Sequence, residues 1–247
     1  MLFRSGHIER FNPAIIALKG QLEMGALGKV YQIHVRRIGP FPGRIKDVGV
    51  VVDLATHDLD IMHYLTDSNV TRLHAEVGRR LHTGHEDLLS AVLRFENDII
   101  GVLDINWLTP TKVRELSVIG ERGMFVANYL TQDLVLYEND SAPQGENWHE
   151  LAVMGVSEGR MIRFKVNKKE PLRQELDAFV SAVRSAGPPP VRGADGLLAL
   201  AVAQKLVESG ASGEALPLDE PHGFAWPPVA LRPSEPALVM AELGGHR

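Results

Sequence analysis

Residues 87–108, with the sequence DLLSAVLRFENDIIGVLDINWL, decide the fold class. Apolar side chains recur at every second position in the first half of this stretch, which is typical of a strand with one buried face. The residues on the apolar side are Leu89, Ala91, Leu93 and Phe95. Asn97 and Asp98 follow as typical turn residues, so we expect the second half to return as an antiparallel strand.

The same pattern continues on both sides of this hairpin. GERG (120–123) is a second turn between two apolar-alternating segments, and further strands are expected at 29–37, 133–138 and 161–166. Such short loops favour antiparallel neighbours in a meander over βαβ crossovers.

Helices are expected on either side of these strands. One begins after Asn12, a good N-cap followed by Pro13, and ends near Gly25; two more are expected at 171–187 and 193–210. The predicted fold class is α+β, a large and mostly antiparallel sheet with helices packed on one face.

Composition excludes several classes of protein. The net charge of -5 shows no basic excess, so we expect no nucleic-acid partner. No apolar run approaches the ~20 residues that span a bilayer, and the first residues do not form a signal peptide. The chain has no cysteine, which excludes disulfides and thiolate chemistry and fits a reducing compartment. We therefore expect a cytoplasmic protein that does not bind membranes.

The stretch VVDLATHDLDIMHYL (51–65) carries the candidate chemistry. On a helix its apolar residues form a wide arc, and Asp53 and His57 lie one turn apart on the remaining polar stripe, with Cβ atoms ~5–6 Å apart. An aspartate beside an imidazole suits a base that takes a proton from an alcohol. Asp58 falls inside the apolar arc and needs a partner or an opening there.

Two other interpretations of this stripe remain open. Amphipathic helices with solvated Asp and His residues are common, and Asp53, His57 and Asp60 could instead be metal ligands. A serine nucleophile is disfavoured, because the chain has no Gly-x-Ser-x-Gly elbow.

Three segments together resemble a known family. They are GHIERFNPA (6–14), GPFPGRIKDVGVVVDLATHDLDIMHYL (39–65) and RQELDAFVSAVRSAGPPPVRGADGLLALAVAQKLVESGASGEALPL (173–218). The chain resembles the C-terminal α/β domain of the Gfo/Idh/MocA family of NAD(P)-dependent sugar oxidoreductases over about residues 5–218. The first two segments look most like the subgroup acting on UDP-N-acetylated aminosugars and their uronates.

This resemblance implies roles for two residues. His57 matches the family's acid/base histidine and Asp53 the aspartate that positions it, in oxidation of a secondary sugar alcohol with NAD or NADP. The family's Gly-x-Gly-x-x-G loop and Glu-Lys-Pro motif are both absent from this chain. We therefore expect the substrate-binding and acid/base half of a dehydrogenase, inactive alone and with the cofactor site largely missing.

The resemblance also divides the chain and suggests further ligands. Residues 1–12 are expected to be a junction remnant, 13–218 a substrate-binding and oligomerisation domain, and 219–247 a proline-rich tail. The candidate substrate-binding residues are Glu9, Arg10, Asn12, Arg44 and Asp60. Arg10 suits a diphosphate or carboxylate, whereas Asn12 also reads as a simple helix cap. Arg36, Arg37 and Lys46 could add to an anionic-sugar site or form a solvated basic edge.

A sheet covered on one face leaves the other face to a partner. We expect a homodimer or tetramer formed through that open face, with Leu103, Ile105 and Trp107 supplying its apolar side chains. A sugar or nucleotide sugar is the expected small-molecule partner. The rival hypotheses are a non-enzymatic domain that binds a sugar nucleotide or a protein, and a metal-dependent hydrolase.

Overall fold

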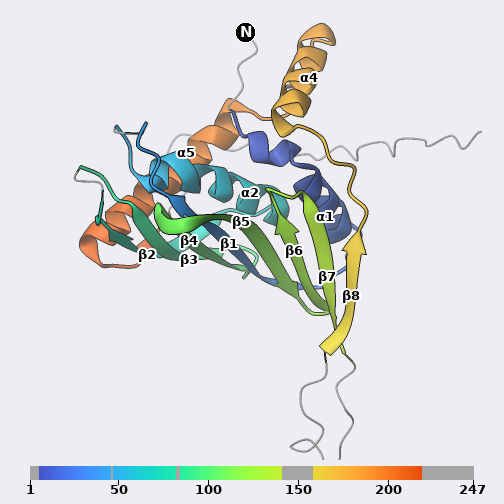
Figure 1. The fold of residues 1–247 in the computed structure, drawn as a ribbon, viewed down its shortest axis with the longest axis horizontal. Coiled ribbons are helices and arrows are strands. Elements are labelled where there is room, and N and C mark those ends of the chain that lie inside the picture. The colour runs from blue at the N-terminus through green and yellow to red at the C-terminus, as the bar shows by residue number, and fades with distance from the viewer. Residues whose placement is uncertain (1–5, 46, 82–83, 141–157, 219–247) are drawn as a thin grey trace, which may run out of the picture.

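The computed structural model describes residues 6–45, 47–81, 84–140 and 158–218 (Figure 1). The strands are β1 (Val30–Pro40), β2 (Val70–Gly78), β3 (Leu88–Phe95), β4 (Ile100–Asn106), β5 (Leu108–Gly120), β6 (Gly123–Asn128), β7 (Asp133–Asn139), β8 (Glu158–Phe164) and β9 (Leu216–Pro217). The helical elements are the 3-10 turn η1 (Ile8–Phe11), α1 (Pro13–Glu23), the π-helical turn η2 (Val51–Ala55), α2 (Thr56–Thr66), α4 (Pro171–Arg184) and α5 (Gly193–Ser212).

The strands form one nine-stranded sheet in the order β8-β7-β6-β5-β1-β4-β3-β2-β9. The expected fold class is confirmed, since every neighbouring pair is antiparallel except β1 and β4. The meander is less regular than expected, because β1 lies between its two halves, β2-β3-β4 and β5-β6-β7-β8. The first strand of the chain thus occupies the middle of the sheet.

All helices except α4 pack as one layer on the sheet. Figure 1 shows α1, α2 and α5 over one face of the sheet, whereas α4 projects away from it and contacts η1. Asn12 caps α1 as expected, its side-chain oxygen accepting a hydrogen bond of 3.1 Å from the N–H of Ala14. Within the described residues, no helix has the length and apolar character that crossing a bilayer would require.

The residues assigned to the open face of the sheet belong to the other face. Leu103, Ile105 and Trp107 are only 1%, 0% and 3% exposed, and the Trp107 ring packs edge-on against Phe41 with centroids 5.7 Å apart. The prediction was wrong because a period of two separates the faces of a strand without showing which face the helices cover.

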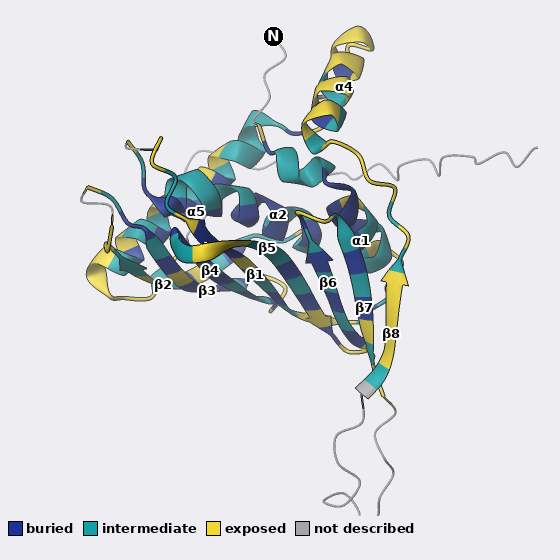
Figure 2. Ribbon diagram, in the orientation of Figure 1, coloured by how far each residue is buried: buried dark blue, intermediate teal, exposed yellow. Residues whose placement is uncertain are grey.

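The open face instead carries the alternate residues of the same strands. They form a band on the strands from β3 to β8, and Figure 2 shows most of β8, at one edge of the sheet, as exposed. This open-face band consists of Val92, Val102, Ile119, Met124, Val126, Tyr137 and Met161. Ile119, Tyr137 and Met161 are at least one-third exposed, so an apolar strip remains uncovered.

A glycine in β4 sets how closely α2 approaches the sheet. A Cβ at Gly101 would lie 3.1 Å from Phe95 and 3.2 Å from the sulfur of Met62, a residue of α2. Such contacts are too close to be accommodated without movement of well-packed neighbours.

We expect Gly101→Val to lower the free energy of unfolding by about 1–3 kcal/mol, because it overpacks the contact between α2 and the sheet. Gly20→Ala, within α1 where an added Cβ meets nothing, should raise it by about 0.5–1 kcal/mol. Chemical denaturation measures both changes. A Gly101→Val protein as stable as the wild type would contradict the close packing.

Candidate active site

The helix that carries the candidate chemistry begins with a π-helical turn. Asp53 lies in η2 and His57 at the start of α2, so the expected single α-helix is interrupted in its first turn. Glu86 holds this start, its backbone oxygen accepting from the N–H of Val50 at 2.8 Å and its side chain from Val51 at 3.3 Å. π-helical turns are rare and are often found at functional sites.

Asp53 and His57 are half-buried and interact electrostatically, with no hydrogen bond between them in the described structure. Burial raises the pKa of Asp53, and the charges of Arg44 and of a protonated His57 act in the opposite direction. Nδ1 of His57 is buried and has no hydrogen-bond partner among the described residues. One imidazole nitrogen is therefore free for a polar ligand atom or a rotated Asp53 carboxylate.

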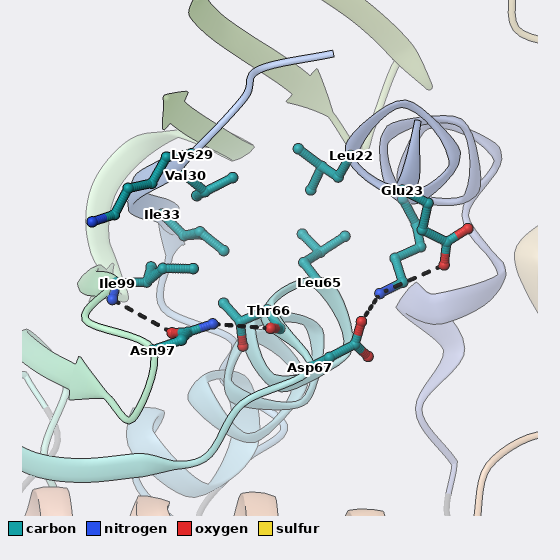
Figure 3. Close-up of a pocket in the computed structure, with 11 residues that line it drawn as sticks. Leu22, Glu23, Lys29, Val30, Ile33, Leu65, Thr66, Asp67, Asn97 and Ile99 are labelled. Carbon is teal, nitrogen blue, oxygen red and sulfur yellow. Dashed lines mark hydrogen bonds and ion pairs between the residues drawn. The ribbon is translucent and has the colours of Figure 1, made fainter. Parts of the chain in front are cut away.

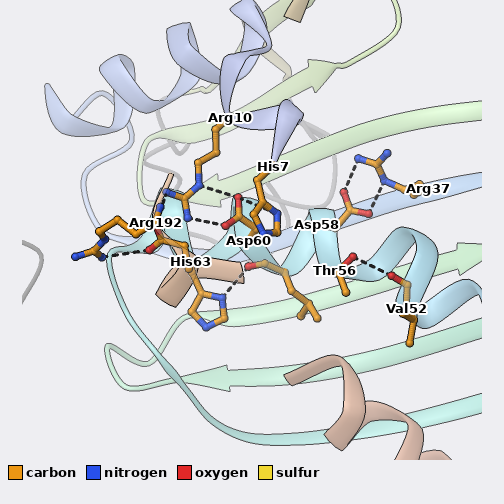
Figure 4. A network of polar contacts seen from close by, with 11 residues as sticks. His7, Arg10, Arg37, Val52, Thr56, Asp58, Asp60, His63 and Arg192 are labelled. Carbon is orange, nitrogen blue, oxygen red and sulfur yellow. Dashed lines mark hydrogen bonds and ion pairs between the residues drawn. The ribbon is translucent and has the colours of Figure 1, made fainter. Parts of the chain in front are cut away.

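Asp58, which the sequence places inside an apolar arc, has a strong partner. Arg37 of β1 donates two hydrogen bonds to its carboxylate, at 2.5 and 2.8 Å, and a third to Glu9 at 3.1 Å. Although burial opposes the charge, these carboxylates raise the pKa of Arg37, which stays protonated. This contact ties α2 to the sheet and to η1 (Figure 4). Arg37 is thus not part of a solvated basic edge.

Arg10 and Asp60 form a second polar network. The Arg10 guanidinium donates to both Asp60 oxygens, at 2.7 and 2.6 Å, and lies 3.7 Å from Asp195 at the start of α5 (Figure 4). Asp60 is buried. Both residues were predicted to bind substrate, yet the structure uses these groups to join η1, α2 and α5.

Of the other predicted ligands, Asn12 and Glu9 have structural partners, whereas Arg44 is exposed. Asn12 is buried, caps α1 and donates to the backbone oxygen of Tyr129 at 3.0 Å. Glu9 accepts from Arg37, as described above. Arg44 is exposed and is the charge that acts most on Asp53. Arg36 points to the open face, 3.5 Å from Asp104, and Lys46 lies outside the described residues.

The alternative metal ligands Asp53, His57 and Asp60 do not converge. Asp60 is occupied by Arg10, and no group of three or more His, Cys, Asp or Glu side chains in the described ranges could hold a metal ion. The geometry of these donors therefore gives no support to the hydrolase hypothesis.

Sequence reasoning missed two residues beside this helix. His7 is buried with its ring 6.0 Å from that of His57, and burial lowers its pKa. Arg114 of β5 shares the helix-covered side of its strand with Leu116 and Val118. The sequence did contain a signal for Arg114, because a charged residue rarely occupies the same face of a strand as two core residues.

A cavity of about 300 Å³ lies at the opposite end of α2. Its floor is apolar, and its rim includes Lys19 in an ion pair with Asp67 (Figure 3). Asp67 follows His57 by ten residues, so about 15 Å of helix separates the two. This cavity is not part of the candidate active site.

Comparison with known proteins is consistent with this geometry. Residues 15–126 match the GFO/IDH/MocA C-terminal domain. Myo-inositol 2-dehydrogenase of Thermotoga maritima is 23% identical, over 87% of this chain and 64% of its own length. UDP-N-acetylglucosamine 3-dehydrogenase of Acidithiobacillus ferrooxidans is 25% identical, over 80% of this chain and 59% of its length.

A solved structure of the latter type of enzyme shares the fold. UDP-N-acetylglucosamine 3-dehydrogenase from Acidithiobacillus ferrooxidans superposes with a TM-score of 0.71 at 23% identity, covering 84% of this chain and 62% of that one. The chain therefore spans less than two-thirds of the length of these two relatives.

We expect Asp58→Leu to lower the free energy of unfolding by about 3–5 kcal/mol, because it removes the main partner of a buried guanidinium. Arg37→Met combined with Asp58→Leu should recover most of the loss, since no bidentate pair is then broken. Urea denaturation of the two single variants and the double variant completes the cycle. Additive losses would show that the two residues are not coupled.

Proposed function

We propose that this chain, which carries a C-terminal domain of the GFO/IDH/MocA family, is the substrate-binding and acid/base half of an NAD(P)-dependent oxidoreductase. The substrate class is a secondary alcohol of a sugar or nucleotide sugar. The observation that carries the proposal is the pair Asp53 and His57 at the start of one helix, with a free imidazole nitrogen. The named activities of the two relatives, on inositol and on a UDP-sugar, support this class.

The proposed chemistry of these residues is proton transfer. His57 accepts the proton of the substrate hydroxyl, and the Asp53 carboxylate favours the imidazolium that results. The positive charges that act on Asp53, chiefly Arg44, also favour negative charge on the substrate oxygen as its proton leaves. Exposed Arg44 can reach a ligand without breaking an ion pair described above.

The residues of this chain do not fit a dinucleotide cofactor. No two glycines in the sequence are separated by a single residue, so the chain has no Gly-x-Gly turn to bring backbone N–H groups against a pyrophosphate. We derive no hydride step from these residues. This same feature favours the second candidate function, a non-enzymatic domain that binds a sugar nucleotide.

We also propose that the open-face band pairs two copies of the chain. Uncovered apolar residues on six strands of one sheet face are unusual on a monomer, and a two-fold interface lets the same surface cover itself. A cysteine-free chain is compatible with the reducing cytoplasm, where we propose that it acts.

The 247-residue chain is expected to bind UDP-N-acetylglucosamine, its uronate or myo-inositol without reducing NAD or NADP, because its sequence has no Gly-x-Gly turn to hold the pyrophosphate that positions a nicotinamide. His57→Ala should weaken binding about fivefold, as expected for one lost hydrogen bond. His74→Ala, on the open face of β2, is the matched control and should bind normally. Calorimetry measures binding, and nicotinamide absorbance measures turnover.

Each outcome of this experiment has a distinct meaning. Reduction of the cofactor by the wild-type chain would contradict its inactivity alone. Binding that is equal in His57→Ala and His74→Ala would contradict the assignment of the site.

We expect Ile119→Lys to shift the chain from dimer or tetramer to monomer, because it places a charge in the middle of the open-face band. Leu200→Lys, at an equally exposed position of α5 on the helical layer, should leave the assembly unchanged. Light scattering at tens of micromolar measures the mass. A monomeric wild-type chain would refute the pairing.

A further inference from the structure

Two arginines face each other on the helix-covered side of the sheet, next to the candidate active site. Arg37 of β1 and Arg114 of β5 are direct partners in the antiparallel register. Side chains at such positions have Cβ atoms about 4.5–5.5 Å apart, and like charges there repel. An arrangement of this kind needs compensating negative charge.

Carboxylates compensate the charge of Arg37 through direct hydrogen bonds, whereas Arg114 has no such contact among the described residues. Arg37 donates three hydrogen bonds to Asp58 and Glu9. Nη1 of Arg114 is buried and has no hydrogen-bond partner among the described residues. Asp58, Glu9 and Asp53 act on Arg114 only through longer-range electrostatics.

Arg114 nevertheless carries its charge at neutral pH. Burial, followed by the charge of Arg37, lowers the pKa of Arg114 to about 10. At pH 7 that leaves roughly one molecule in a thousand uncharged. The Arg114 side chain is half-buried, and its buried N–H without an acceptor is the kind of group that an incoming anion satisfies.

A purely structural role explains Arg114 less well. The charges of Arg37 and Arg114 together balance those of Asp58 and Glu9, so Arg114 helps to neutralise this cluster. That balance still leaves the Nη1 hydrogens without an acceptor. A neutral hydroxyl could accept one hydrogen bond, but a carboxylate or phosphate can accept two parallel hydrogen bonds from the same guanidinium.

We propose that Arg114 binds an anionic group of the substrate, a carboxylate or a phosphate, beside the alcohol that His57 deprotonates. This inference rests on the function proposed above and adds the charge of the substrate. Asp53 lies within electrostatic range of both Arg114 and His57, and the proposal places one sugar-sized ligand against these two side chains. The site would then select an acidic or phosphorylated sugar over a neutral polyol.

The test compares three sugars that differ only in the group at C6. Glucose, glucuronate and glucose 6-phosphate are titrated by calorimetry, up to millimolar concentration, against the whole chain. We expect at least one anionic sugar to bind about tenfold more tightly than glucose, the gain of one charge-assisted contact. Which anion is preferred distinguishes a carboxylate from a phosphate.

Variants assign the preference to Arg114. Arg114→Met should abolish the anion preference while leaving glucose binding within about twofold, and Arg114→Lys should retain part of it. Arg72→Met removes an exposed arginine of β2 as a matched control and should keep the full preference. Circular dichroism melting confirms that each variant is folded; if Arg114→Met does not fold, Arg114→Lys with reduced preference carries the comparison.

The outcomes separate this inference from the proposed function. Equal binding of all three sugars, or an anion preference that survives in Arg114→Met, would overturn the role of Arg114 and leave a sugar site at His57 intact. Failure of the wild-type chain to bind any of the three sugars would overturn this inference, and it would overturn the proposed function as well if UDP-N-acetylglucosamine, its uronate and myo-inositol also failed to bind.

Discussion

The contact between Arg37 and Asp58 is the interaction on which the candidate site depends. Asp58 is fully buried among apolar neighbours of α2, where an unpaired carboxylate would not be tolerated. Arg37 supplies two hydrogen bonds from the middle strand of the sheet, and Glu9 completes its coordination from η1. His57 directly precedes Asp58 in the chain. Because Arg37 of β1 holds Asp58 in place, it also fixes the position of the neighbouring imidazole above the sheet.

Around this contact the charges serve two purposes. Arg10 and Asp60, with Asp195 nearby, hold η1, α2 and the start of α5 together on one side of His57. Their hydrogen-bonding groups are taken up in doing so. The positive charge left for a ligand then belongs to exposed Arg44 and to half-buried Arg114.

The parts of the fold and site that the sequence predicted are those governed by local spacing. Asn12 followed by Pro13 predicted the start of α1, because a cap acts on the next turn of its own helix. The Asn97–Asp98 turn predicted the β3–β4 hairpin. The proximity of Asp53 and His57 likewise followed from their separation along one helix, although the π-helical turn did not. The need of Asp58 for a partner could be read from its place in an apolar arc.

By itself, then, the sequence determined the periods, turns and caps, and with them an antiparallel sheet with helices on one side, because these depend on interactions within a few residues. Only the tertiary structure decided which face of β4 the helices cover, and it placed Trp107 under them. It also inserted β1 between two halves of the meander, which brought Arg37 opposite Arg114 and beneath Asp58. Residues separated by 21 and 77 positions met there because packing of the whole sheet, and no local preference, determines which strands become neighbours.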